Sequence, residues 1–113
     1  MTRPATELLH GTLETMILRV LASERAHGYA IARQIEAALA GAQPIEDGSL
    51  YPALYRLERR RLIRGDWGVS DAGRRARFYG ITPAGCKELT KRTRQWSAFA
   101  GGVSRLLLGK AGQ

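Results

Sequence analysis

The chain has 113 residues, enough for one domain with a modest core and an appended helix, but too few for two independent domains. Eighteen Lys and Arg against ten Asp and Glu give a net charge of +8, and this excess, nearly all arginine, favours a polyanion as the partner. No stretch is long and apolar enough for a membrane span or a signal peptide, and the single Cys86 fits a reducing compartment, so we expect a cytoplasmic protein.

Two helices are predicted in the first part of the chain. Residues 1–7 carry no periodic signal and are expected to form a flexible end. From about Thr12 to Ala22, apolar residues recur at helical spacing, which predicts a first helix with one buried face. Ser23 to His27 reads as a polar connection, and Gly28 to Ala40 then shows apolar residues four apart before Gly41, which predicts a second helix.

The third helix is the segment around which the chain is organised. Its sequence from Gly48 to Ile63 is GSLYPALYRLERRRLI, in which Leu50, Leu54 and Leu57 form one apolar stripe and tyrosines and arginines occupy the other faces. Ser49 is the expected N-cap, because Pro52 then falls in the first turn, where a missing N–H does no harm. The helix is expected to run to about Leu62.

A hairpin with a basic tip is predicted next. The segments Ile63–Val69 and Ala76–Ile81 are rich in aromatic and β-branched residues, and the turn cluster SDAGRR separates them. Three arginines gather at or near the tip of this two-stranded hairpin, namely Arg74, Arg75 and Arg77.

Thr82 and Pro83 predict the start of a fourth helix, because threonine is a good cap and proline fits the first helical position. The helix can run to about Leu108, continuous through Gly101-Gly102 or bent there, and residues 109–113 are expected to be a flexible end. Its apolar seam exceeds what one small domain can cover, so we expect a homodimer through this helix. The expected interface residues are Leu89, Trp96, Phe99, Val103 and Leu106.

This order of elements predicts an α+β, mainly α fold, a winged helix-turn-helix domain over residues 8–81 with a C-terminal dimerisation helix over residues 82–108. The segments HGYAIARQIE, GSLYPALYRLERRRLI and WGVSDAGRRARFYGITPAG resemble the PadR-like family of bacterial transcriptional regulators over about residues 8 to 100. The resemblance implies a homodimeric winged-helix repressor, of the subgroup with a single short C-terminal helix that forms the dimer.

Candidate DNA contacts follow from the resemblance and from the charge pattern. The resemblance places Tyr29, Ser49, Tyr51, Pro52, Tyr55 and Arg56 on DNA, and the charge pattern adds Arg59, Arg60, Arg74, Arg75 and Arg77. The chemistry agrees, because helix N-terminal amides and hydroxyls bind phosphate, and an arginine such as Arg56 can form two hydrogen bonds with a guanine edge.

Several of these assignments have a structural alternative. Tyr51 can belong partly to the core, and the wing arginines can be plain surface charge. Arg61 is better explained as a solvated residue at the helix end. Trp96 is better explained as ordinary dimer core, and contact with a small aromatic effector between subunits, which the resemblance suggests, is the alternative. His27 and Cys86 have no companions at metal-ligand spacing and are read as structural.

The sequence shows no phosphate-binding glycine loop, carboxylate cluster or activated nucleophile, so we expect no enzymatic activity, and no cofactor or metal. The predicted function is sequence-specific binding of double-stranded DNA at an inverted-repeat operator, with repression of transcription. A winged-helix module for protein or RNA binding is the alternative, because the fold does not determine the ligand.

Overall fold

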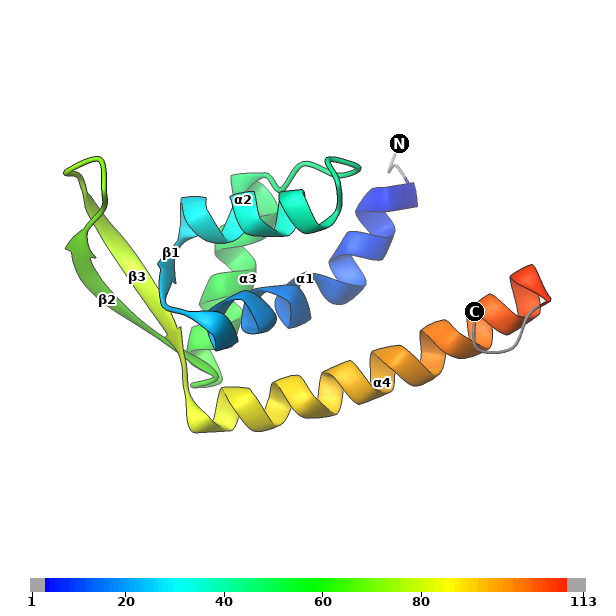
Figure 1. The fold of residues 1–113 in the computed structure, drawn as a ribbon. Coiled ribbons are helices and arrows are strands. Elements are labelled where there is room, and N and C mark those ends of the chain that lie inside the picture. Colours follow the sequence, from blue (N-terminus) through cyan, green and yellow to red (C-terminus); the bar gives the residue numbers. More distant parts are fainter. Residues whose placement is uncertain (1–3, 110–113) are drawn as a thin grey trace.

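The computed structural model describes the backbone of residues 4–109 and the side chains of residues 11–109. The helices α1 to α3 pack around one core, a small sheet closes one end of it, and α4 runs along its edge and beyond (Figure 1). This arrangement confirms the predicted winged-helix fold with a C-terminal helix. In chain order, the elements are α1 (Pro4–Ser23), β1 (Ala26–His27), α2 (Gly28–Ala38), α3 (Asp47–Arg59), β2 (Ile63–Val69), β3 (Arg75–Ile81) and α4 (Pro83–Leu108).

The core forms where the three helices meet. The predicted stripe of α3 is fully buried, with Leu50, Leu54 and Leu57 at most 1% exposed. Burying each such side chain contributes roughly 1.5–3 kcal/mol, so this stripe fixes how α3 is rotated about its axis and which face it turns outwards. The stripe belongs to one cluster with Ile17, Leu18, Ile31 and Ile35 of α1 and α2.

Helix α3 differs from the prediction at both ends. Its N-cap is Glu46 and not Ser49, so the helix begins at Asp47. The backbone carbonyl of Glu46 accepts hydrogen bonds from the amides of Ser49 and Leu50, at 3.0 and 2.9 Å, and no side chain caps the helix. Pro52 therefore lies inside the helix, where it has no N–H for the carbonyl of exposed Gly48. The helix ends at Arg59, before the expected Leu62, because the chain turns left-handed at a φ of 60° two residues later.

The sheet has three strands in the order β1-β3-β2, where the sequence predicted a two-stranded wing. The extra strand lies in the segment read as a polar connection, and its Ala26 pairs with Tyr79 of β3. Next to it, His27 pairs with Phe78 and caps α2, because its Nδ1 accepts a hydrogen bond from the amide of Ala30 at 3.3 Å. This gives His27 a structural role, and the described residues hold no cluster suited to a metal ion.

The first two helices also differ from their expected bounds. Helix α1 begins at Pro4 instead of about Thr12, with proline in the first turn, where its fixed φ suits a helix. Residues 4–7 are thus helical, and Gly109 is the C-cap of the last helix. The remaining predicted flexible positions, 1–3 and 110–113, lie outside the described residues. Helix α2 ends at Ala38, before Ala40, because both Ala40 and Gly41 take positive φ angles, of 54° and 74°.

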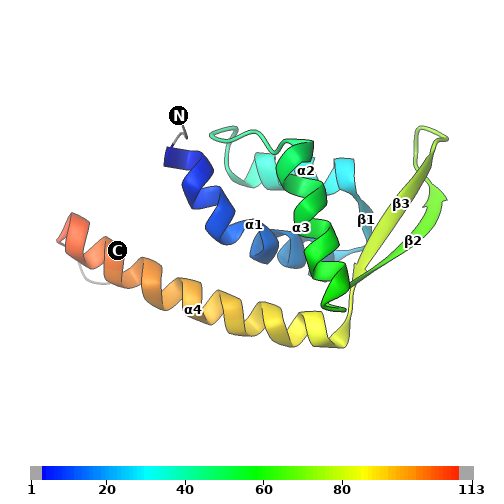
Figure 2. The same cartoon turned by 180° about the vertical axis from the view of Figure 1, so that it is seen from behind.

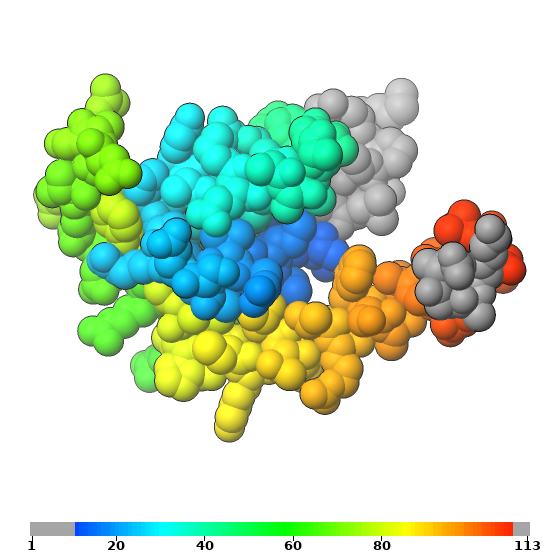
Figure 3. Space-filling view, viewed as in Figure 1, coloured from blue at the N-terminus to red at the C-terminus, as the bar shows by residue number. Residues whose placement is uncertain are grey.

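Helix α4 starts as predicted and forms one continuous helix through Gly101-Gly102. Thr82 Oγ1 accepts a hydrogen bond from the amide of Gly85 at 3.0 Å and lies 2.8 Å from the Arg61 carbonyl, to which it donates. Gly85 packs directly on the backbone of Leu62, which leaves no space for a side chain. The far end of α4 projects beyond the body of the domain (Figure 3) and gives the molecule its longest extent, 50 Å. Within residues 4–109, no helix is long and apolar enough to cross a membrane.

Candidate nucleic-acid interface

A groove separates the wing formed by β2 and β3 from the first turns of α2 and α3. Figure 2 shows α3 in front, with the wing rising beside it. The groove has a volume of 790 Å³ and combines aromatic rings with wing arginines. It is lined by His27, Gly28, Tyr29, Tyr51, Trp67, Ser70, Asp71, Ala72, Arg74, Arg75, Ala76, Arg77 and Tyr79.

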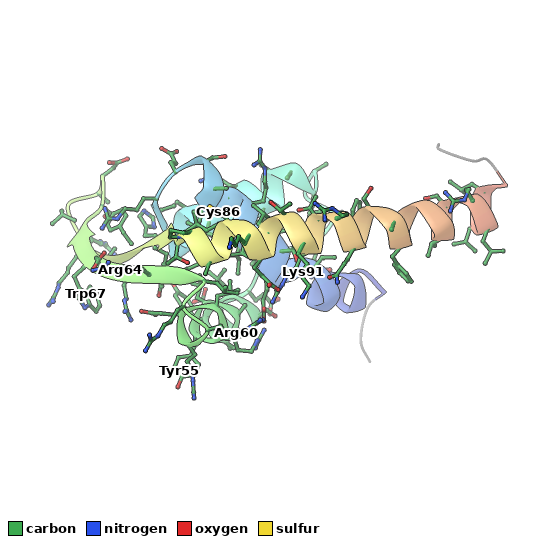
Figure 4. All side chains as sticks on the ribbon, turned by 90° about the horizontal axis from the view of Figure 1, so that it is seen from below. Tyr55, Arg60, Arg64, Trp67, Cys86 and Lys91 are labelled. Carbon is green, nitrogen blue, oxygen red and sulfur yellow. The ribbon has the colours of Figure 1, made fainter. Side chains whose placement is uncertain are left out.

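Three tyrosines predicted to contact DNA are exposed beside this groove or on the outer face of α3. Tyr29, Tyr51 and Tyr55 have exposed fractions of 65%, 47% and 60%. Tyr51 is therefore not a core residue, whereas its neighbour Leu50 is. Tyr55 points away from α4, as Figure 4 shows. The exposed phenol groups offer donors to a ligand on this side of the molecule.

The remaining predicted contacts at the start of α3 differ in their exposure. Pro52 is exposed, and Ser49 is half-buried without acting as the helix cap. The first turn of α3 still presents amides without intrahelical partners, and such amides attract anions.

Arg56 is the predicted guanine contact, and the structure places it in an ion-pair network that joins three helices. Its Nε donates to Glu14 Oε2 of α1 at 2.7 Å. The other carboxylate oxygen, Oε1, accepts from Nη1 of Arg92 on α4 at 2.9 Å, and Arg92 Nε in turn donates to Glu88 Oε2 at 2.6 Å. Arg56 remains 56% exposed, so a base contact would use its Nη groups.

This network shifts the pKa of its central carboxyl group. Partial burial by itself would raise the pKa of Glu14, but the hydrogen bonds and charges of Arg56 and Arg92 outweigh that effect. The pKa of Glu14 therefore lies below its usual value, and the group stays ionised. Glu88 shows the same direction, because the hydrogen bond from Arg92 lowers the pKa of its carboxyl group.

The arginines at the end of α3 stay at the surface. The guanidinium of Arg59 lies 5.8 Å from the ring centroid of Tyr55, and its Nη1 lies 3.5 Å from the Tyr55 hydroxyl. Arg60 and Arg61 are exposed beyond the helix end. These charges extend the basic outer face of α3 towards the start of the wing.

The wing arginines fall into two kinds. Arg74 and Arg75 are exposed at the tip, and Arg75 stacks over the ring of Trp67 at 4.5 Å from its centroid. Arg77 is instead half-buried, and its Nη2 donates to Glu58 Oε2 at 2.5 Å and to the Gly65 carbonyl at 3.4 Å. The sequence grouped Arg77 with the tip, but pairing with Glu58 offsets its charge.

Trp67 is a groove residue that was not predicted from the sequence. It is 61% exposed and lies on the wing, as Figure 4 shows, where it supports Arg75. The strand alternation Ile63, Gly65, Trp67 puts it on the same face as the buried Ile63, but past the edge of the core. That alternation, extended beyond the core, is the signal that could have identified it.

The expected dimer residues of α4 do not share one environment. Leu89 is partly buried and packs against the core of its own domain. Trp96 and Val103 follow Leu89 at seven-residue intervals, so one helix face that is covered at Leu89 becomes exposed further along. The exposed fractions are 55% for Trp96, 74% for Phe99, 37% for Val103 and 83% for Leu106.

Comparisons with known proteins agree with this geometry. The model of the transcriptional regulator PadR-like family matches residues 17–91. A PadR-like transcriptional regulator from Bacillus cereus has a similar structure, with a TM-score of 0.78 and 29% identity over 92% of this chain and 99% of that chain. A PadR family regulator from Eggerthella lenta has a TM-score of 0.76 and 32% identity over 91% and 88%. An uncharacterized protein of Lysinibacillus sphaericus is 30% identical over 81% of this chain and 84% of its own length.

Proposed function

Because the chain belongs to the PadR-like family of transcriptional regulators, we propose that it binds double-stranded DNA sequence-specifically as a homodimer and represses transcription from an inverted-repeat operator. Family members are regulators and not enzymes. The observation that carries the proposal is the exposed tyrosine and arginine face of α3 beside the basic wing tip, on a chain with a net charge of +8.

In the proposed complex, α3 enters the major groove and the wing follows the adjacent backbone. The amides of its first turn and the hydroxyl of Ser49 bind a phosphate, and Pro52 lies against the backbone beside them. Tyr29, Tyr51 and Tyr55 donate to phosphate oxygens. Four exposed arginines supply positive charge for the DNA phosphates, namely Arg59, Arg60, Arg74 and Arg75. Arg56 contacts a guanine edge through its Nη groups.

Arg77 has a different role from the other wing arginines in this proposal. Because it donates to Glu58 at the end of α3 and to the carbonyl of Gly65, it holds the wing at a fixed position relative to α3. Its remaining exposed surface lines the groove, so it contributes to DNA binding mainly by setting the width of that groove.

The homodimer forms through the exposed part of α4. Trp96, Phe99, Val103 and Leu106 present a contiguous apolar face beyond the domain core, and such a face is normally covered by a partner. A second copy of the same helix is a self-complementary partner under two-fold symmetry. A small aromatic effector bound at Trp96 remains a prediction, as does the cytoplasmic location.

The selection of duplexes from a random DNA library by the purified protein tests this function. Enrichment of one inverted repeat, together with weak competition by single-stranded RNA, is the expected result. Equal retention of all duplexes, or stronger competition by RNA, would favour a general or an RNA-binding role and contradict the proposal.

A further inference from the structure

Besides the packing of Leu89 on the core, polar and close backbone contacts attach helix α4 to the winged domain at two places, and each place fixes a different property of the helix. The first is its own start, where the Thr82 hydroxyl donates to the carbonyls that follow α3, and Gly85 packs on Leu62. This fixes where the helix begins. The second is Arg92, which lies nine residues or about 14 Å further along the helix axis and bonds to Glu14 of α1. Because this second attachment lies further along the helix, it fixes the direction of the α4 axis relative to the winged domain.

Glu14 is well placed to serve as that point. Its side chain is 22% exposed and that of Arg92 is 19% exposed, so water screens this pair less than a fully exposed pair. Glu88 bonds to the same guanidinium through Nε, which leaves Nη1 for Glu14. The second oxygen of Glu14 bonds to Arg56, so one carboxylate contacts both the DNA-facing helix and the helix that carries the exposed apolar face.

The length of α4 amplifies small changes in its direction. From Pro83 to Leu108 the helix rises about 38 Å. A swing of about 10° at its start would therefore move its far end by about 6–7 Å, which equals roughly two base pairs of B-DNA. In a dimer joined through that far part, the same swing changes the separation of the two α3 helices.

We propose that Glu14 is a positioning residue that, through Arg92, sets the angle of α4 and thereby the half-site spacing that the dimer accepts. The inference rests on the proposed function, because it assumes a two-fold dimer on an inverted repeat. Glu14 itself needs no contact with DNA. Its effect through Arg92 is on which operators fit both halves at once, and the bond between Glu14 and Arg92 takes no part in binding to one isolated half-site.

The test compares full-length variants on duplexes that carry the selected half-sites at a series of spacings. Glu14→Gln and Arg92→Gln each remove one charged partner of the ion pair between Glu14 and Arg92. Glu88→Gln is the matched control, because it removes an equal charge from the same network but leaves the bond between Glu14 and Arg92 intact. Affinity for a single half-site is measured in parallel, and thermal unfolding and sedimentation confirm that each variant folds and dimerises.

The wild-type protein and Glu88→Gln should prefer a narrow set of spacings. Glu14→Gln and Arg92→Gln should lose roughly threefold to tenfold of the discrimination between the best spacing and its neighbours, because a partly buried ion pair is worth about that much. An unchanged spacing profile in both variants, or equal broadening in Glu88→Gln, would overturn the inference. Failure of the wild-type protein to select any operator would instead overturn the proposed function.

Discussion

The ring of Tyr51 on α3 lies directly against the Cα of Gly28 at the first turn of α2. A methyl group added at Gly28 would come within 2.8 Å of the Tyr51 hydroxyl and 3.1 Å of its ring. The absence of a side chain at Gly28 thus determines where an exposed phenol stands in the groove between the helices and the wing.

Gly28→Ala should therefore weaken DNA binding while it changes stability little, because the far end of the Tyr51 side chain can swing aside. Tyr51→Phe, which removes only the hydroxyl, should lower affinity by about tenfold or more, because a hydrogen bond to a charged group such as phosphate contributes about 1.5–3 kcal/mol. Fluorescence anisotropy with labelled operator duplex measures both. Gly11→Ala is the control, since nothing lies within 4 Å of its added methyl group. Unchanged affinity in both groove variants would remove Tyr51 from the interface.

The exposed wing tip and α3 should contribute differently to specificity. Arg74→Ala should lower affinity about equally for operator and random duplexes and reduce the slope of log affinity against log salt by about 1, as expected for one lost phosphate contact. Arg56→Ala should instead reduce discrimination between the two duplexes, by about 1–3 kcal/mol for a guanine contact. Salt titrations on both duplexes measure these effects. If the wing variant altered sequence preference and Arg56→Ala did not, the two roles would be reversed.

The apolar face of α4 should control association. Trp96→Ala should weaken the dimer by about 2 kcal/mol or more, as truncation of a central interface aromatic usually does. Sedimentation equilibrium at micromolar concentration measures the change. Leu89→Ala should chiefly lower the free energy of unfolding, because Leu89 packs on the core of its own domain. A wild-type chain that is monomeric at these concentrations would contradict the interface.

Acid should weaken the link between α1, α3 and α4. Since the pKa of Glu14 is lowered in the folded state, the ionised form stabilises the fold above the usual value of 4.5, and this contribution is lost as the pH falls. Urea unfolding at several pH values should show a shallower loss of stability below that value in Glu14→Gln than in wild type. If the free energy of unfolding fell with pH by the same amount in both proteins, ionisation of Glu14 would not contribute to stability.

The features predicted correctly from the sequence are those encoded locally. The stripe of Leu50, Leu54 and Leu57 follows from helical spacing alone, and the cap at Thr82 follows from two adjacent residues. The α3 start was missed because its cap is the backbone carbonyl of Glu46, which any residue supplies. Strand β1 was missed because two residues show no alternation, and its pairing with β3 is distant in sequence.

In the candidate site, too, the features encoded locally could be predicted and the contacts between distant residues could not. The exposure of Tyr29 and Tyr55 could be expected, because each lies off the buried stripe of its helix. The partner of Arg56 could not, since Glu14 is 42 residues away in the chain and only the packing of α1 on α3 brings them together. Charge counts likewise treat Arg77 as equal to its neighbours at the wing tip.

The central claim is that two α3 helices, joined by α4, bind one face of one duplex. It is tested most directly by footprinting the wild-type protein on the selected operator and on variants with five or ten base pairs inserted between its halves. The half-sites should be centred about 10 base pairs apart or at a near multiple, and the protein should protect both halves of the unaltered operator. Because about 10 base pairs make one helical turn, five inserted pairs should abolish joint protection of the two halves, and ten should partly restore it. Equal protection of both halves at all three spacings would contradict the account, since it would mean that the two winged domains bind independently.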